Sequence, residues 1–373
     1  MPFTVDKLYS VGIVVHNIEA AALKYAEIYG IDDWDVREYG QDRLTDTRSY
    51  GRPTAPTFRT ATGTTNWQSV SEGTFGSATA VTFELVEPLT GESPFQEFAA
   101  VRGQGISHLA ISVVDEGALA DLTKEMAERG ITLAASMTVD AAVQRHFFDT
   151  REALGGFLIE VRVPITSDVP AGEVMHWNLH GRYSRPEGVA PISVVGVAHF
   201  GVVVDDLMKT LPRYHELLGI SNWNVNRLQA KPGSLEDPFY RELRPVDHEY
   251  FTGMTPVSDF GFELIQPTRG PSHYNREFRD LTGPGIHHML LSLTTDENEW
   301  NDTRSWLTSI DVPTVMGAEF FHGAASFCYY DTVADLGGYI VEGLLVRDID
   351  RFVGTPPSYV VDYTELEAGK ALS

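Results

Sequence analysis

Short runs of alternating apolar residues recur along the chain. The run over residues 10–18 (SVGIVVHNI) is echoed over residues 199–207 (HFGVVVDDL), and the run over residues 107–115 (SHLAISVVD) is echoed over residues 288–296 (HMLLSLTTD). Alternation of this kind is typical of β-strands, because successive side chains point to opposite faces of a sheet. The pattern therefore predicts four equivalent strands.

A helix is predicted after the first strand of each half of the chain. Apolar residues recur there at helical spacing: Ala21, Leu23, Ala26 and Ile28 in the first half, and Leu207, Leu211, Tyr214, Leu217 and Leu218 in the second. Gly30 and Gly219 follow, as expected just past a helix C-terminus. Three strand-like segments come next, the last of them closed by proline in TFELVEP and FGFELIQP. Each unit reads strand–helix–three strands, and the chain holds four such units.

The units pair into two tandem modules. Trp34 recurs as Trp223, 189 positions on, and Glu160 recurs as Glu342, 182 positions on. So small a drift over a whole module indicates a duplicated domain. We predict modules over residues 1–168 and 193–350, a linker rich in Pro, Gly and His over 169–192 that wraps the surface without apolar period, and a C-terminal strap over 351–373.

Composition and charge narrow the function class. The 373 residues are 43% hydrophobic, which suits about two packed domains. The 28 basic and 52 acidic side chains give a formal net charge of −24, and such a surface repels phosphate backbones and anionic membranes. We therefore expect no nucleic-acid partner and no membrane partner. Cys328 is the single cysteine, so an intrachain disulfide and a thiolate metal cluster are excluded. The first residues do not resemble a signal peptide, and we expect a cytoplasmic protein.

Four ligand-type residues occupy matching positions in the second module. His199 and His288 stand at the first strands of its two units, and Glu263 and Glu342 stand in the last strands. A carboxylate among apolar strand residues is costly unless it is paired or bound to a cation. Imidazole and carboxylate groups are natural ligands of divalent metals. These four residues therefore predict a metal site.

The same motifs resemble the vicinal oxygen chelate superfamily. The resemblance rests on AHFGVVV at His199, FELIQP at Glu263, GPGIHHMLLSL at His288 and DTVADLGGYIVE ending at Glu342, and it covers nearly the whole chain as two modules. It implies an α+β fold of four βαβββ units that form two glyoxalase-like cups. It also implies a His, Glu, His, Glu ligand set for one divalent ion, which would be zinc, nickel, cobalt or manganese, or Fe(II) in a dioxygenase.

The first module departs from this pattern. Glu84, His108 and Glu160 occupy three of the ligand positions, but Ser10 stands where the first histidine should be. A serine hydroxyl is a poor ligand for such metals, so we expect a degraded site and a structural module, and the sequence leaves open whether that site binds anything. In the second module, strand alternation predicts that His287 points away from His288. His322, Tyr329 and Tyr330 are candidates for contact with substrate.

The resemblance implies a metal-dependent lyase or isomerase that acts on a small molecule with vicinal oxygens through a metal-stabilised enediolate. Glu342 is the expected general base, with Glu263 as the alternative base or the reprotonating acid. An Fe(II) extradiol-type ring-cleaving dioxygenase is the alternative, with His199, His288 and Glu342 as its triad; Glu263 argues against it, because a fourth protein ligand fills a place that substrate or oxygen needs. A metal-free binding or resistance protein is a third hypothesis. The aromatic-rich composition favours a ring-containing substrate, and the sequence leaves the choice between monomer and homodimer open.

Overall fold

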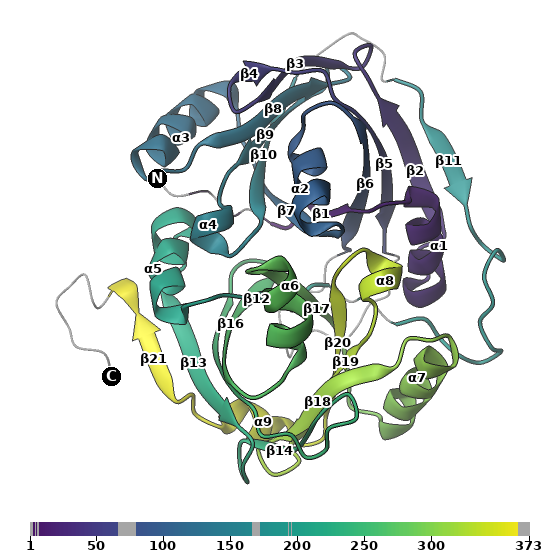
Figure 1. Ribbon diagram of the computed structural model, residues 1–373, viewed down its shortest axis with the longest axis vertical. Helices are drawn as coiled ribbons and strands as arrows, with labels where there is room; N and C mark the ends of the chain where they lie inside the picture. The colour runs from purple at the N-terminus through teal and green to yellow at the C-terminus, as the bar shows by residue number, and fades with distance from the viewer. Residues whose placement is uncertain are drawn as a thin grey trace.

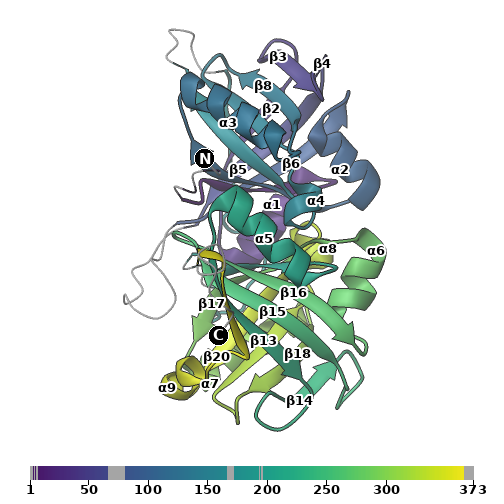
Figure 2. The ribbon, with the colours of Figure 1, turned by 90° about the vertical axis from the view of Figure 1, so that its left-hand side faces the viewer.

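The computed structural model describes residues 3, 5, 7–65, 80–165, 172–192, 194 and 196–364. The chain forms two curled sheets, one from each half of the sequence, and the two sheets are stacked along the long axis of the molecule (Figures 1 and 2). The longer helices α1, α3, α5 and α7 lie on the outer side of the sheets (Figure 1). Each curled sheet is called a cup below.

The first cup is an 11-stranded sheet in the order β11-β2-β5-β6-β1-β7-β10-β9-β8-β3-β4. Its strands are β1 (Ser10–Val14), β2 (Asp33–Tyr39), β3 (Leu44–Ser49), β4 (Arg52–Pro53), β5 (Thr57–Thr64), β6 (Thr82–Thr90), β7 (Gly105–Val113), β8 (Leu133–Val139), β9 (Val143–Phe148), β10 (Leu158–Pro164) and β11 (Met175–Asn178).

The second cup is a 10-stranded sheet in the order β14-β18-β19-β20-β17-β12-β16-β15-β13-β21. Its strands are β12 (His199–Val203), β13 (Asn222–Gln229), β14 (Leu235–Tyr240), β15 (Glu249–Pro256), β16 (Gly261–Arg269), β17 (Gly285–Thr294), β18 (Thr314–Phe320), β19 (Ala325–Tyr330), β20 (Ile340–Val346) and β21 (Tyr359–Asp362).

The first strands of paired units lie side by side at the centre of each cup. Strand β1 is antiparallel to β7, and each of the two is parallel to the last strand of its own unit, β6 or β10. Strands β12 and β17 repeat this arrangement with β16 and β20. The predicted α+β fold of four βαβββ units in two tandem modules is confirmed.

Two of the helices, α1 and α5, end at the predicted glycines. The helices are α1 (Ile18–Tyr29), α2 (Pro94–Arg102), α3 (Glu116–Glu128), α4 (Arg151–Leu154), α5 (Leu207–Leu218), the π-helix η1 (Tyr274–Arg279), α6 (Asp280–Thr282), α7 (Glu297–Ser309), α8 (Val333–Leu336) and α9 (Ile349–Gly354). Asn17 and Asp206 cap the first turns of α1 and α5 through their side chains. Gly30 and Gly219 end these helices with φ of 71° and 69°, a left-handed conformation that glycine adopts without steric cost.

The two modules contact each other reciprocally. Tyr25 on α1 donates a hydrogen bond to the carbonyl of Leu336 on α8 (3.0 Å), and its repeat partner Tyr214 on α5 donates one to Leu154 on α4 (2.8 Å). One buried apolar cluster runs through the helix-facing sides of both modules, whereas each cup interior has a cluster of its own. The modules therefore fold against each other as one body with two separate cup interiors.

Part of the predicted linker has regular structure, which the sequence did not indicate. Residues of the linker form β11, which extends the first sheet by pairing with the edge strand β2, and Ile192 is buried in the shared cluster. In the C-terminal strap, β21 pairs with β13 at the edge of the second sheet, and residues 365–373 lie outside the described residues. Among the described helices, none combines the length and hydrophobicity that a bilayer span requires.

Candidate metal centre

The second cup brings the four predicted ligands together. His199, Glu263, His288 and Glu342 come from the neighbouring strands β12, β16, β17 and β20, and all four side chains are buried. Gly201 makes room for His288, because a Cβ atom there would lie 1.9 Å from Cε1 of that ring. Gly12 does the same beneath His108 in the first cup.

The donor atoms have the spacing of a coordination shell. Nε2 of His199 lies 3.0 Å from Oε2 of Glu342 and 3.3 Å from Nε2 of His288. Oε2 of Glu263 lies 3.4 Å from His199 and 3.3 Å from His288, and all four ligand atoms lie within 4.8 Å of one another. Ligands about 2.0–2.2 Å from one metal ion, at angles between octahedral and tetrahedral, lie about 2.8–3.6 Å apart. The four side chains thus fit one divalent ion.

The charge of this cluster also suits a cation. Among the described residues, the two imidazoles are the only ion-pair partners of Glu263 and Glu342. Burial opposes the charge on His288, but hydrogen bonds with Glu263 and Glu342 outweigh it and raise its pKa to about 9. Burial would likewise raise the pKa of Glu342, yet contacts with His199 and His288 lower it to about 2. The carboxylates therefore stabilise positive charge here, on a proton or on a metal.

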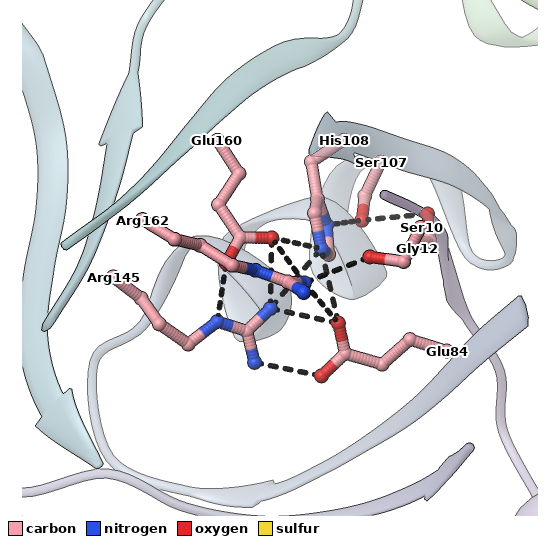
Figure 3. A network of polar contacts seen from close by, with 8 residues as sticks. All are labelled: Ser10, Gly12, Glu84, Ser107, His108, Arg145, Glu160 and Arg162. Carbon is pink, nitrogen blue, oxygen red and sulfur yellow. Dashed lines mark hydrogen bonds and ion pairs between the residues drawn. The ribbon is translucent and has the colours of Figure 1, made fainter. Parts of the chain in front are cut away.

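The first cup satisfies its carboxylates with arginine (Figure 3). The Arg145 guanidinium donates to Glu84 through Nη1 and Nη2 (2.6 and 2.7 Å) and to Glu160 through Nε (2.6 Å). Arg162 donates to Glu160 (2.8 Å) and to Oγ of Ser10 (2.7 Å). His108 stays in the cluster, with Nε2 3.5 Å from Oε2 of Glu160. The two guanidinium groups thus supply the positive charge that the buried carboxylates of this cup need.

Neither Arg145 nor Arg162 was predicted from the sequence to belong to the site. Arg145 and Arg162 face each other across β9 and β10, and the same register in the second cup pairs Phe327 with Leu344. Alignment of the two repeats could have identified Arg145, because Arg145 and Phe327 both stand 15 positions before the last glutamate of their module and differ in charge. The expectation of a degraded first site rested on Ser10 and stays a prediction; the two arginines add a second physical reason for it.

Three aromatic rings line each cup in the same arrangement. In the first cup they are Phe58, Phe95 and Phe147; in the second they are Tyr250, Tyr274 and Tyr329. The hydroxyls of Tyr274 and Tyr329 lie 2.6 Å apart, and the Tyr329 ring centroid lies 4.9 Å from that of His288. Only the second cup therefore has buried hydroxyl groups on these rings, next to the candidate metal ligands.

The other sequence candidates lie in different surroundings. The Oη of Tyr330 lies beside Gly343 and its ring belongs to the cluster shared by the modules, away from the Tyr329 ring. His322 is largely exposed and pairs with Glu236 (3.0 Å). His287 was predicted to point away from His288, and that prediction is wrong: the Nδ1 atoms of the two rings lie 3.0 Å apart. The physical reason is a β-bulge in β17, where the register with β12 shifts and places both rings in the cup.

Comparisons with known proteins agree with this fold. Residues 10–148 match the sequence model of the Glyoxalase/Bleomycin resistance protein/Dioxygenase superfamily. The structure is similar to that of a triple mutant of 4-hydroxymandelate synthase from Streptomyces coelicolor, with a TM-score of 0.51 and 13% sequence identity over 93% of this chain and 94% of that chain. It is more distantly similar to BphC, a halotolerant catechol dioxygenase, with a TM-score of 0.39 and 12% identity over 92% and 87% of the two chains. No curated protein matches the sequence.

Proposed function

We propose that this chain is an enzyme that acts on a small molecule and uses one divalent metal ion, held in the second cup. Its tandem-module fold is that of the glyoxalase, bleomycin resistance and dioxygenase (vicinal oxygen chelate) superfamily. Most members of this superfamily are metal-dependent enzymes. The observation that carries the proposal is the set of four buried donors from His199, Glu263, His288 and Glu342, within 4.8 Å of one another. The contrast with the first cup supports it, because there Arg145 replaces the ion.

Within that class we favour a lyase or isomerase. A divalent ion held by the four side chains would supply Lewis acidity to a substrate that binds through two adjacent oxygens. Contacts with His199 and His288 keep Glu342 ionised at neutral pH, so it is available as the base that takes the proton from the carbon beside a substrate carbonyl. Glu263 stands across the cluster and can return a proton. The aromatic lining excludes bulk water and suits a ring-containing substrate.

A ring-cleaving dioxygenase with Fe(II) is the second candidate. His199, His288 and Glu342 are the closest three donors, at 3.0–3.3 Å, and they form the two-histidine, one-carboxylate triad of non-haem iron oxygenases. Glu263 counts against this candidate, since its oxygen lies nearly as close to both imidazoles, at 3.3–3.4 Å. A fourth protein ligand leaves less room for substrate and oxygen together.

Metal analysis tests the proposal directly. We expect one equivalent of tightly bound metal in protein purified without chelator, and we expect His199→Ala to lose it. The matched first-cup variant His108→Ala should keep the full equivalent. Zinc, nickel, cobalt or manganese supports the lyase or isomerase, whereas stoichiometric iron with oxygen uptake on catechols supports the dioxygenase. A wild-type protein that binds no divalent metal would overturn the proposal.

A further inference from the structure

A row of buried side chains runs from the back of His288 to the protein surface. Nδ1 of His288 lies 3.0 Å from Nδ1 of His287, and Nε2 of His287 lies 2.8 Å from Nδ1 of His273. Nε2 of His273 faces Oε2 of Glu277 at 3.7 Å. All three histidines are at most 1% exposed. Glu277 is partly exposed and also accepts hydrogen bonds from Tyr240 and Arg241, each at 2.6 Å.

We propose that His287 and His273 are positioning residues, which hold His288 in the tautomer and ring orientation that present Nε2 to the metal. The inference rests on the metal centre proposed above. Ligating histidines commonly donate their second ring N–H to a fixed acceptor, and removal of that acceptor typically weakens metal binding by about 10–100-fold. Here the acceptor for His288 is Nδ1 of His287, and His273 holds His287 in turn.

The hydrogen-bond donors and acceptors along this row can be assigned in one consistent way. Nε2 of His288 must be unprotonated to bind a metal, so Nδ1 carries the hydrogen and donates to Nδ1 of His287. His287 then carries its hydrogen on Nε2 and donates to His273, and His273 carries its hydrogen on Nε2, toward the Glu277 carboxylate. Burial lowers the pKa of His273 to about 4, so this ring is neutral at pH 7, as the solution requires.

Two irregularities of the backbone build the row. The bulge in β17 is the first: Gly201 pairs with His288 and Val202 with Ile286, so His287 is the extra residue and its ring turns into the cup. The π-helix η1 is the second. Gly270 stands 18 positions before His288, whereas its counterpart Gly91 stands 17 positions before His108. One inserted residue is a common origin of a π-turn, and such turns occur often at functional sites. Here the turn follows directly on His273.

The first cup has the same bulge but no row. Ser107 takes the place of His287, with Oγ 2.9 Å from Nδ1 of His108. Beyond His108, the partner that the structure gives this hydroxyl is the backbone carbonyl of Gly12, at 3.3 Å, and not a second histidine. Among the described residues, the longer row thus occurs only in the cup that has all four candidate ligands, which is expected if it serves the metal.

Cobalt(II) binding to the full-length protein tests the inference. Affinity is measured by competition with a chromophoric chelator, and the visible absorption bands of the bound ion report its geometry. We expect His287→Leu to weaken binding about 10–100-fold and to alter these bands. His287→Gln should bind nearly as wild type, because its side-chain carbonyl can accept the hydrogen of Nδ1. His273→Phe should fall between the two, and Ser107→Ala should change nothing.

Three outcomes overturn the inference. His287→Leu that binds cobalt as tightly as wild type shows that the acceptor is dispensable. Equal losses in His287→Leu and His287→Gln, with both variants folded by circular dichroism, reduce the role of His287 to packing. A wild-type protein that binds no cobalt removes the proposed function itself, and the inference with it; the first two outcomes leave that function standing.

Discussion

Glu160 and Glu342 are the same residue at the same place in two repeats, yet their neighbours give them opposite chemistry. Glu160 accepts hydrogen bonds from Arg145 and Arg162, so its oxygens are committed to permanent cations. Glu342 faces only His199 and His288 among its described ion-pair partners. Arginine therefore neutralises Glu160 permanently, whereas Glu342 keeps its oxygens for a proton or for the proposed metal ion.

The first prediction concerns this pair. Glu342→Gln should lower turnover by about 10²–10⁴-fold, the usual cost of losing a general base, and by more if the ion is lost as well. Glu160→Gln, its matched control, should keep near-wild-type turnover. The assay follows a substrate found by screening hydroxyketones, together with exchange of the substrate's α-proton for solvent deuterium. Full activity in Glu342→Gln would contradict its assignment as the base.

The second prediction concerns acid stability. Burial would raise the pKa of Glu160, but the charges of Arg145 and Arg162 outweigh it and lower the pKa from 4.5 to about 2. Between pH 4.5 and about pH 2, Glu160 is protonated in the unfolded chain but ionised in the folded chain. The stabilisation is therefore complete above about pH 4.5 and is lost as the pH falls toward 2. Its size is on the order of 3 kcal/mol at about 1.4 kcal/mol per pKa unit.

Urea unfolding between pH 3 and pH 7 measures this effect. Glu160→Gln should be less stable than wild type at pH 7, because Arg145 is left buried with one partner fewer. It should also lose less of its free energy of unfolding on acidification. Parallel pH profiles for the two proteins would show that Glu160 is not a source of the acid sensitivity.

At the scale of elements, the regular parts of the fold follow from sequence and the irregular parts do not. Alternating apolar residues and the glycines after α1 and α5 were sufficient to predict four strand–helix–strand units, because these signals are local. The bulge at His287 could not be predicted in this way, since strand alternation assumes an unbroken register and therefore placed His287 on the face opposite His288. The π-turn in η1 and the pairing of β11 with β2 depend on tertiary contacts that periodicity does not report.

The candidate site shows the same limit. That the four candidate ligands of the second cup lie together could be predicted, because they stand at matching positions of the repeated units. Arg145 was not predicted, because arginine is not a metal ligand and here supplies positive charge to the carboxylates itself. His273 was not predicted either, because its place in the row depends on a one-residue insertion. In both cases the two repeats, read side by side, contained the information.

At the scale of the whole molecule, the proposed function gives the two cups different roles, metal binding in the second and packing in the first. The modules share one apolar cluster and exchange reciprocal tyrosine contacts through Tyr25 and Tyr214, so neither can be removed without exposing apolar surface of the other. This packing role of the first module does not require a metal ion. Arg145 and Arg162 keep its cup packed and its buried charges paired, independently of metal supply.

This division predicts that a metal site can be restored in the first cup. The triple variant Ser10→His, Arg145→Phe and Arg162→Leu gives the first cup the residues of the second at all three positions, and Glu84, His108 and Glu160 are already in place. Removal of both guanidinium groups leaves two buried carboxylates that need a cation, and the new histidine completes a four-donor set. We expect two equivalents of bound zinc in place of one.

Metal stoichiometry and thermal melting with and without zinc measure the result. Zinc should raise the melting temperature of the triple variant more than that of wild type, because ion binding now also stabilises the first cup. The double variant Arg145→Phe/Arg162→Leu keeps Ser10 and serves as the control, and it should bind its second equivalent more weakly for want of the fourth ligand. A folded triple variant that still binds one equivalent would contradict the view that arginine occupies the place of a metal in the first cup.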